Sequence, residues 1–350
     1  MITQKIKIKE YTSASVVGKS TRPSPKKLVE SSNTHSDLNI NFLKLSSAMV
    51  KANISEIVSI KEQVFDAFLS GLGLLGLISY SQHNIKLKSG FRKKYRDFSR
   101  TGRVGELSQA INYIFAQEKL GFKFVLDFDT FLNNTRIAPL STGQAPDYVL
   151  LGKANKNLAL LESKGSSQKS CLTKAELRAK LQGAMDNQCG SGHKHLTANS
   201  TFNVSNSYAS VVELAESSEA RDSTIHFADP EYDEFEERDY STIIRKFYSR
   251  WLSFLGVDGA IDIFNESGEF TFPRQQFGLI KKNGSDYYVQ KSTYSYKYLN
   301  VPIKFGVSKD IVDLIEKNDY QSIYLLEHNV ISDGNVEFFL DGTLALLDEK

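Results

Sequence analysis

The middle third of the chain alternates apolar and polar positions in the way that helices and strands require. Between residues 105 and 120 the apolar side chains recur at the spacing of a helix with one buried face. They are Leu107, Ala110, Ile111, Ile114 and Phe115. Residues 121–131 follow with a bulky apolar side chain at every second position from Phe122 to Phe128, which predicts a strand.

Two short apolar runs and a helix-start signal come next. Residues 147–152 and 158–164 predict two strands, joined by a turn at residues 153–157. Thr173 and Glu176 have the spacing of a capping box, so we expect a helix to begin there and to end near residue 187.

Further strands, expected at residues 207–216 and 223–227, complete an order of helix, three strands, helix and strand. The first 50 residues are rich in Ser, Thr, Lys and Asn with little periodicity and predict an irregular arm or a loosely packed layer, whereas residues 55–78 predict a helix. The fold class expected is α/β, in three regions. These are a basic N-terminal region at residues 1–103, a core at 104–230 and a mixed α/β region at 231–350.

The C-terminal third contains aromatic-rich elements. Residues 240–255 predict an amphipathic helix that carries the single Trp, and residues 308–318 predict a second helix. Residues 336–347 predict a hairpin that turns at Asp341 and Gly342. The tyrosines of residues 285–299 could stack on bases, but packing within a sheet explains them more simply.

Charge is distributed unevenly along the chain, although its formal total is only +2 at pH 7. Residues 1–104 hold 18 Lys and Arg against 7 Asp and Glu, and residues 105–350 hold 25 against 34. Residues 86–103 interleave cations with aromatic side chains, which is typical of a solvated surface and also of a strip that contacts phosphates. The candidate contacts to nucleic acid, there and on the second helix, are Arg92, Lys93, Lys94, Arg96, Arg100, Lys174 and Arg178.

Composition excludes several classes of protein. With 41% hydrophobic residues the chain can bury a core and is neither disordered throughout nor collagen-like. Cys171 and Cys189 cannot form a disulfide framework, and no apolar stretch of a secretory signal is present, so we expect a cytoplasmic location. The apolar run at residues 67–80 is too short to span a bilayer. Its glycines spell GxGxxG without the preceding strand or following acid, so we expect neither membrane association nor a nicotinamide cofactor.

The predicted hairpin brings charged side chains together. If its turn is centred between Ala154 and Asn155, Asp147 lies opposite Glu162, and opposed residues have Cβ atoms about 5 Å apart on one face. Lys164 points to the same face because side chains alternate with a period of two. Two such carboxylates repel each other unless a cation lies between them, and oxygen ligands of this kind suit Mg²⁺. A solvated hairpin tip with an ordinary surface ion pair is the alternative.

Pro146-Asp147, followed after 14 residues by Glu162-Ser163-Lys164, resembles the motif of the PD-(D/E)xK nuclease superfamily. That superfamily has the restriction-endonuclease-like fold, whose core of helix, three-stranded meander, helix and strand is similar to the order predicted above. The resemblance covers roughly the middle third of the chain. It implies metal-dependent hydrolysis of phosphodiester bonds.

The resemblance also implies roles for individual residues. Asp147, Glu162 and the backbone carbonyl of Ser163 would bind Mg²⁺ or Mn²⁺. Many relatives carry a further Glu on the first core helix, and Glu106 stands where that residue would be. Lys164 would orient the attacking water and help to deprotonate it.

Other residues allow other chemistry. A zinc site could be formed by Cys171, Cys189, His193 and His195. Their spacing matches no common structural zinc pattern, and the segment CGSGHKH predicts a mobile loop. Asp127 and Asp129 share one face of the strand predicted at residues 121–131 and could be auxiliary ligands, although a solvated face explains them more simply.

The function expected is therefore that of a Mg²⁺-dependent DNA endonuclease, with RNA left open as a substrate. Many exonuclease-like relatives carry Gln followed four residues later by Tyr on the second helix, whereas Gln182 is followed by Asp186 here, which favours endonuclease subgroups. A role as the nuclease subunit of a prokaryotic anti-phage system, with a protein partner, is an extension of this expectation. The alternative is a subunit that keeps the fold and binds nucleic acid or regulates a partner without cleaving. The four candidate catalytic residues favour cleavage, because a binding module has no need of clustered acids near phosphate.

Overall fold

The computed structural model divides the chain into two compact units. The central unit comprises residues 2–53 and 70–237, and the C-terminal unit comprises residues 54–69 and 238–350 together with Met1. The described residues are 2–13, 28–53, 73, 76–141, 144–152, 158–199, 202, 204–229, 239–260, 270–293, 295–296, 299–300, 303–328, 330, 332 and 334–348. Within these ranges no helix is both long enough and apolar enough to cross a membrane.

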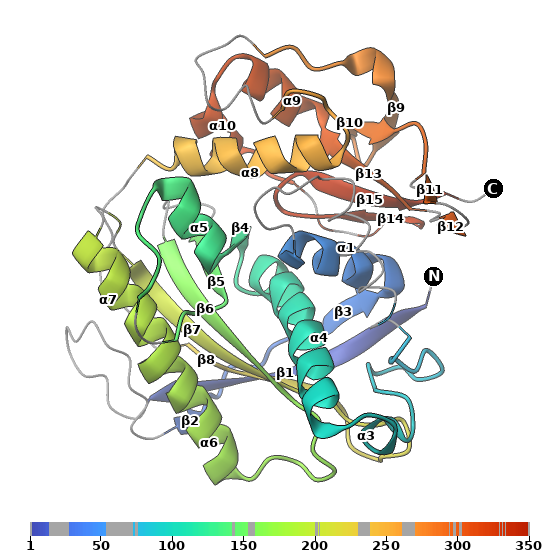
Figure 1. Ribbon diagram of the computed structural model, residues 1–350. Coiled ribbons are helices and arrows are strands. Elements are labelled where there is room, and N and C mark those ends of the chain that lie inside the picture. Colours follow the sequence, from blue (N-terminus) through green and yellow to red (C-terminus); the bar gives the residue numbers. More distant parts are fainter. Residues whose placement is uncertain are drawn as a thin grey trace. The chain divides into compact units, whose positions relative to one another are not determined.

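The central unit is built on a mixed sheet, shown in Figure 1, so the α/β class is confirmed. Its strands follow the order β2-β1-β8-β7-β6-β5-β4, and β3 pairs with β1. The pairs β4–β5, β5–β6 and β7–β8 are antiparallel, whereas β6–β7 and β1–β8 are parallel. The strands are β1 Thr3–Ser13, β2 Leu28–Glu30, β3 Leu38–Asn41, β4 Phe122–Asp127, β5 Tyr148–Gly152, β6 Leu158–Ser166, β7 Val204–Glu213 and β8 Thr224–Ala228.

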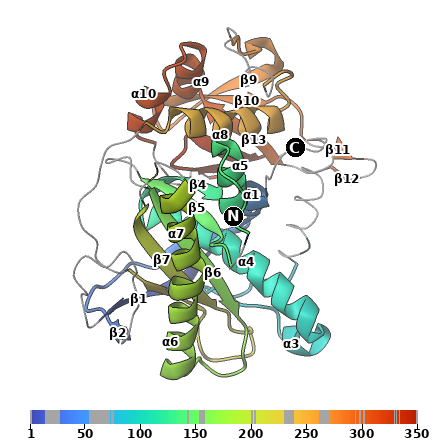
Figure 2. The same cartoon turned by 60° about the vertical axis from the view of Figure 1, so that its left-hand side comes forward.

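Helices cover both faces of this sheet. Along β6, Ser163 and Gly165 face helix α4, whereas Lys164 faces the π-helix that continues α6. Figures 1 and 2 both show β6 running between α4 and α6. The helices are α1 Phe42–Asn53, α3 Phe91–Lys94, α4 Asp97–Glu118, α5 Phe128–Thr135, α6 Lys174–Gly183, the π-helix Ala184–Cys189 and α7 Gly190–Asn199.

The apolar runs of β5 and β6 form the centre of the core. Residues 148–152 are all buried, and Leu158–Leu161 are fully shielded from solvent. Strands buried on both faces read as continuous apolar runs rather than alternating ones, which is why these two segments could be recognised from sequence. The expected capping box is confirmed as well, because the Thr173 hydroxyl accepts from the Glu176 N–H and the Glu176 carboxylate accepts from the Thr173 N–H.

The N-terminal residues form a strand of the sheet. The prediction of an irregular arm is wrong for β1, whose Gln4, Ile6, Ile8 and Glu10 are buried while the lysines between them are exposed. β1 pairs in parallel with β8 and antiparallel with β3. The alternation was missed because half of its buried positions are polar, and a hydrophobicity pattern does not count polar residues as core.

Two other segments differ from expectation. The strand expected at residues 121–131 ends at Asp127, whose carboxylate accepts from the Thr130 N–H at 2.8 Å and so caps α5. Asp127 and Asp129 therefore do not share a strand face. The segment CGSGHKH is helical rather than a mobile loop, because the π-helix carries the chain from α6 into α7. Of the helix expected at residues 55–78, only Gly73 and residues 76–78 are described.

The C-terminal unit has its own five-stranded sheet, in the order β14-β15-β13-β10-β9. The expected helix with Trp251 is α8, and the indole N–H donates to the carbonyl of Gly306 at 3.1 Å. Tyr287 and Tyr288 are buried in the sheet, as packing rather than base stacking requires. The elements are α8 Ser241–Phe254, a 3₁₀ turn Arg274–Gln276, β9 Phe277–Lys282, β10 Ser285–Gln290, β11 Ser295–Tyr296, β12 Leu299–Asn300, β13 Ile303–Ser308, α9 Lys309–Glu316, α10 Tyr320–Leu325, β14 Val336–Phe338 and β15 Thr343–Leu347.

Candidate active site at the ends of β5 and β6

Two carboxylates meet where β5 begins and the buried part of β6 ends. The observed pairing of Tyr148 with Leu161 confirms the register expected from sequence and places Asp147 beside Glu162. The Asp147 N–H donates to Glu162 Oε2 at 3.1 Å, and the Ser163 N–H donates to Asp147 Oδ2 at 2.8 Å. Each carboxylate is thus held by the backbone of the other strand, which sets their separation without a flexible side chain between them.

A lysine closes one side of this pair. Lys164 Nζ lies 2.5 Å from Glu162 Oε1, and the side chain of Lys164 is 33% exposed whereas that of Glu162 is 4% exposed. Gln188, on the π-helix, faces the same amine when its amide is oriented so that Nε2 donates to the carbonyl of Gly183 at 2.9 Å. Its Oε1 then accepts from Lys164 Nζ at 2.5 Å. The Lys164 ammonium therefore lies between the Glu162 carboxylate and the Gln188 amide, while the Lys164 side chain remains partly exposed to solvent.

The first core helix, α4, contributes an amide rather than the expected acid. Gln109 Nε2 donates to Asp147 Oδ1 at 2.8 Å. Deeper in the same helix, Asn112 donates to Ser163 Oγ at 2.6 Å and accepts from Ser210 Oγ at 2.7 Å. Glu106 is exposed, and it does not form a cluster with Asp147 and Glu162 among the described residues. The residue of α4 that contacts Asp147 is Gln109, three residues further along the helix, and the metal-site role expected for Glu106 stays a prediction.

Two glycines let helices approach the site closely. A Cβ on Gly165 would lie 2.7 Å from Ser108 Oγ and 2.8 Å from the carbonyl oxygen of Val104, so α4 packs on β6 only because this residue is Gly. A Cβ on Gly192 would lie 2.8 Å from the ring of Pro146, which fixes α7 against the residue before Asp147. The spacing of the site therefore depends on backbone contact from both sides.

The electrostatics of the pair are unusual for two acids. Burial, with the charge of Asp147 next to it, raises the pKa of Glu162 to about 7, although Lys164 acts in the opposite direction. Burial also raises the pKa of Asp147, outweighing the hydrogen bonds from Ser163 and Gln109. Asp127 adds a further negative charge nearby and raises the pKa of Asp147 as well. One ammonium thus accompanies several acids, and a bound cation would relieve the repulsion.

The oxygens of the pair are suitable for a divalent cation. Each carboxylate oxygen accepts one hydrogen bond or ion pair from the chain, which leaves a second lone pair on each. In the described part of the chain no group of three or more His, Cys, Asp or Glu could hold a metal ion. A pair of carboxylates with the remaining positions filled by water and substrate is nevertheless a usual mode of binding Mg²⁺.

The residues considered for zinc have other surroundings. Cys189 is buried, its thiol donates to the carbonyl of Tyr208 at 3.5 Å, and burial raises its pKa well above the ordinary value. Cys171 is exposed, and the ring of His195 contacts the carbonyl of Ala138 at 2.7 Å. These contacts fit a structural role for Cys189 and His195.

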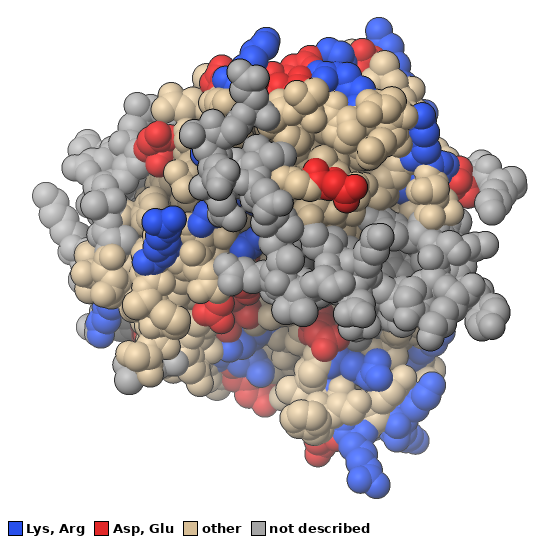
Figure 3. All heavy atoms as spheres, turned by 45° about the horizontal axis from the view of Figure 1, so that its top comes forward, with Lys and Arg blue, Asp and Glu red and all other residues tan. Residues whose placement is uncertain are grey.

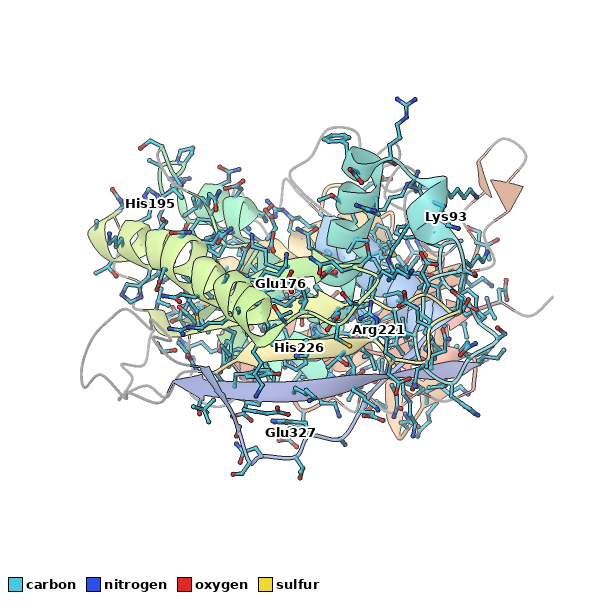
Figure 4. The ribbon with its side chains drawn as sticks, turned by 90° about the horizontal axis from the view of Figure 1, so that it is seen from below. Lys93, Glu176, His195, Arg221, His226 and Glu327 are labelled. Atoms are coloured by element: carbon cyan, nitrogen blue, oxygen red, sulfur yellow. The ribbon has the colours of Figure 1, made fainter. Side chains whose placement is uncertain are left out.

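The predicted nucleic-acid contacts fall into two groups. The Arg92 side chain is engaged inside the fold, where its guanidinium binds Glu219 and the carbonyls of Ser167 and Gln168. Arg100 forms an ion pair with Asp97 at 2.6 Å. The exposed members are Lys93, Lys94, Arg96, Lys174 and Arg178. Figure 4 labels Lys93 on α3, and Figure 3 shows basic side chains gathered at the lower right edge, the side on which α3 lies in Figure 1.

Sequence reasoning missed Gln109, Gln188 and the fold-internal role of Arg92. Gln109 lies about 100° or more around the helix axis from each residue of the predicted apolar stripe, so the hydrophobic pattern of α4 did not point to it. The position of Gln188 depends on a π-helical turn, and no local sequence pattern predicted that turn. No family model, curated protein or solved structure matches this chain.

Proposed function

We propose that the protein is a Mg²⁺-dependent nuclease that hydrolyses phosphodiester bonds in DNA. The observation that carries the proposal is the pair of the partly buried Asp147 and the buried Glu162, joined backbone to side chain, with the amine of Lys164 at 2.5 Å from Glu162. The pKa values of both acids are raised above their ordinary values when no cation is bound. A divalent cation between them would therefore be bound more favourably than at an ordinary pair of surface carboxylates.

The topology supports the resemblance to the restriction-endonuclease-like core. α4 precedes the antiparallel meander β4–β5–β6, the helical segment α6–α7 follows, and β7 then pairs in parallel with β6. Asp147 directly precedes the second strand of that meander, and Glu162, Ser163 and Lys164 lie in the third. Fold alone does not carry function, so the proposal rests on the geometry of the site.

Each residue of the site has its own role in this proposal. Asp147 and Glu162 would hold Mg²⁺, which supplies Lewis acidity to the phosphodiester when it is bound. Gln109 and the Ser163 N–H keep the Asp147 carboxylate in one orientation. Lys164, partly open to solvent and held by Glu162, would orient the attacking water and a phosphate oxygen.

The test uses supercoiled plasmid with Mg²⁺ or Mn²⁺ and compares the wild type with Asp147→Asn, Glu162→Ala and Lys164→Ala. We expect each substitution to lower the nicking rate by about 100-fold or more, the range for loss of a group that acts on the reacting atoms. Asp258→Asn and Lys317→Ala are matched controls, since both residues are exposed in the C-terminal unit and should leave the rate unchanged.

Equal nicking by the wild type and the three site variants would contradict the assignment. Salt-sensitive DNA binding without cleavage in either metal would instead favour the non-cleaving subunit. Matched DNA and RNA duplexes, cut in parallel reactions, identify the substrate.

A further inference from the structure

One stripe of α4 connects an exposed aromatic residue to the candidate site. Phe98, Gly102, Gly105 and Gln109 fall within about 60° of one another around the helix axis, at 3.6 residues per turn. Exposure decreases along the stripe: Phe98 is 93% exposed, Gly102 is exposed, Gly105 and Gln109 are partly buried, and Gln109 binds Asp147. The stripe therefore descends from the surface to the carboxylate pair.

Packing against the described part of the chain does not require the two glycines of this stripe. A Cβ on Gly102 or on Gly105 would meet nothing within 4 Å. Glycine in the interior of a helix disfavours that helix relative to alanine, so two such residues weaken α4 without an internal benefit. In contrast, Gly165 and Gly192 each have a neighbour that a Cβ would strike. Bare backbone at Gly102 and Gly105 lets a second molecule approach the helix closely.

The upper end of the stripe combines an aromatic ring with cations. Phe98 is the most exposed large hydrophobic side chain among the described residues. The exposed cations next to it in the chain are Lys93, Lys94 and Arg96, and Tyr95 lies between them with Arg103 stacked at 4.9 Å over its ring. The exposed acid next to the ring, Asp97, is paired with Arg100, so positive charge predominates in this stretch of chain. An exposed ring with such neighbours suits a partner with flat apolar faces and a negatively charged backbone, which is the chemistry of a nucleic acid.

We propose that this stripe, the α4 track, is where the nucleic-acid strand lies, with Phe98 stacked on a base. The proposal deepens the nuclease function and rests on it for the position of the cut. Phe98 and Gln109 are 11 residues apart in α4, or about 16 Å at 1.5 Å per residue. With about 3.4 Å per nucleotide along a strand, the stacked base lies about five nucleotides from the bond that is cut.

The experiment measures the affinity for DNA in EDTA, so that cleavage does not interfere. The fluorescent base 2-aminopurine is placed at successive positions of one strand, which is tested both in a duplex and as a single strand. We expect Phe98→Ala to weaken binding about tenfold and to remove the fluorescence change at one position. Phe98→Trp should keep both the affinity and the fluorescence change. Leu325→Ala, which removes another exposed apolar side chain, is the matched control.

A second variant tests the bare backbone. Gly102→Leu adds a side chain where nothing blocks it, so the protein should fold while binding weakens several-fold. Thr101→Leu adds the same side chain about 100° away around the helix and should bind as the wild type does. Thermal unfolding of both variants verifies that the fold is intact.

The outcomes separate the track from the nuclease function. Cleavage that is unaffected by Phe98→Ala and Gly102→Leu, with unchanged binding, overturns the track and leaves the nuclease function standing. Binding that depends on Phe98, with no cleavage in either metal, supports the track and overturns the nuclease function. If neither the duplex nor the single strand binds, both the α4 track and the nuclease function are overturned. A response confined to the duplex identifies Phe98 as a wedge between base pairs, and a stronger response of the single strand identifies open stacking; either supports the track.

Discussion

The central unit contains two groups of buried acids, and their surroundings are opposite. The first is the site pair, Asp147 and Glu162, which shares one ammonium, that of Lys164. The second, the paired cluster, is formed by Glu213, Glu216 and Glu219 with Arg92, Arg221 and His226. Glu213 pairs with Ser166, four residues beyond Glu162 on β6, so the two groups are about 13 Å apart along the strand.

In the paired cluster, cations outweigh the effect of burial. Burial acts to raise the pKa of Glu213, but His226, the Leu172 N–H and Arg221 together hold it below the ordinary value. The pKa of Glu219 is lowered in the same way, by hydrogen bonds from Arg92 and Arg221. Figure 4 labels Arg221 and His226, which contact Glu213 at 2.6 and 3.2 Å. Two arginines and the ring of His226 thus accompany the three glutamates of the paired cluster, whereas the site pair has one ammonium.

The difference separates acids that the fold pairs internally from the two acids that we propose to bind a cation. Glu162 in the first group and Glu213 and Glu216 in the second are buried, and both groups use backbone N–H donors. They differ in the number of cations supplied by the fold, and the site pair keeps an unbalanced negative charge. Buried acids therefore identify a candidate metal site only where the chain does not neutralise them.

The largest expected effect comes from breaking the paired cluster. Arg221→Met leaves Glu213 and Glu219 with less positive charge, and we expect the free energy of unfolding to fall by about 3 kcal/mol, because the Arg221 side chain is only 13% exposed. Urea denaturation measures the change. Arg100→Met is the control, since its partner Asp97 is 88% exposed and the loss should stay below about 1 kcal/mol. Similar losses in both variants would contradict the structural role of the cluster.

The next effect is a pH dependence of opposite sign in the two groups. Because the pKa of Glu162 is raised from 4.5 to about 7 on folding, the folded chain holds a proton that the unfolded chain has released. The free energy of unfolding, without metal, should therefore fall by about 2–3 kcal/mol as pH rises from 4.5 to 7 and stay level above. Glu162→Gln should flatten this slope.

Glu219→Gln is the matched variant for that slope. The pKa of Glu219 is lowered, so its contribution to stability is present above pH 4.5 and is lost as pH falls below that value. The substitution should alter the acidic limb of the curve and leave the slope above pH 4.5 as it is. An unchanged slope in Glu162→Gln would show that the site pair carries no uncompensated charge.

The smallest effect concerns the amide that holds Asp147. The hydrogen bond from Gln109 lowers the pKa of Asp147, so Gln109→Leu should raise it further and move the pH midpoint of Mg²⁺ stabilisation upward by up to about one unit. Thermal unfolding with and without Mg²⁺, at matched ionic strength, gives the midpoint. Gln182→Leu is the control, because that amide contacts Asp186 on the helix surface. A midpoint that stays in place would remove Gln109 from the site.

Part of the fold followed directly from local patterns. The register of β5 and β6 could be predicted because two apolar runs of fixed length, separated by five residues that lie outside the described part of the chain, align in one way that keeps both buried. The capping box and the amphipathic α8 are equally local signals. β1 was not recognised, since its buried Gln4 and Glu10 find their hydrogen-bond partners outside the strand, which its own sequence does not reveal. Gln4 donates to carbonyls of residues 79, 82 and 84, and Glu10 accepts from Asn33 and contacts the ring of His35.

The sequence alone determined that Asp147, Glu162 and Lys164 stand at one end of a hairpin, because period-two alternation and strand pairing act over a few residues. The tertiary structure decided what surrounds them. It brought Gln109 rather than Glu106 to Asp147, turned Gln188 toward Lys164, and paired Arg92 with Glu219 across 127 residues of chain. Such contacts depend on how helices pack and on which charges meet at long range. The local patterns place the acids, and the packing of the whole unit decides which of them remain uncompensated.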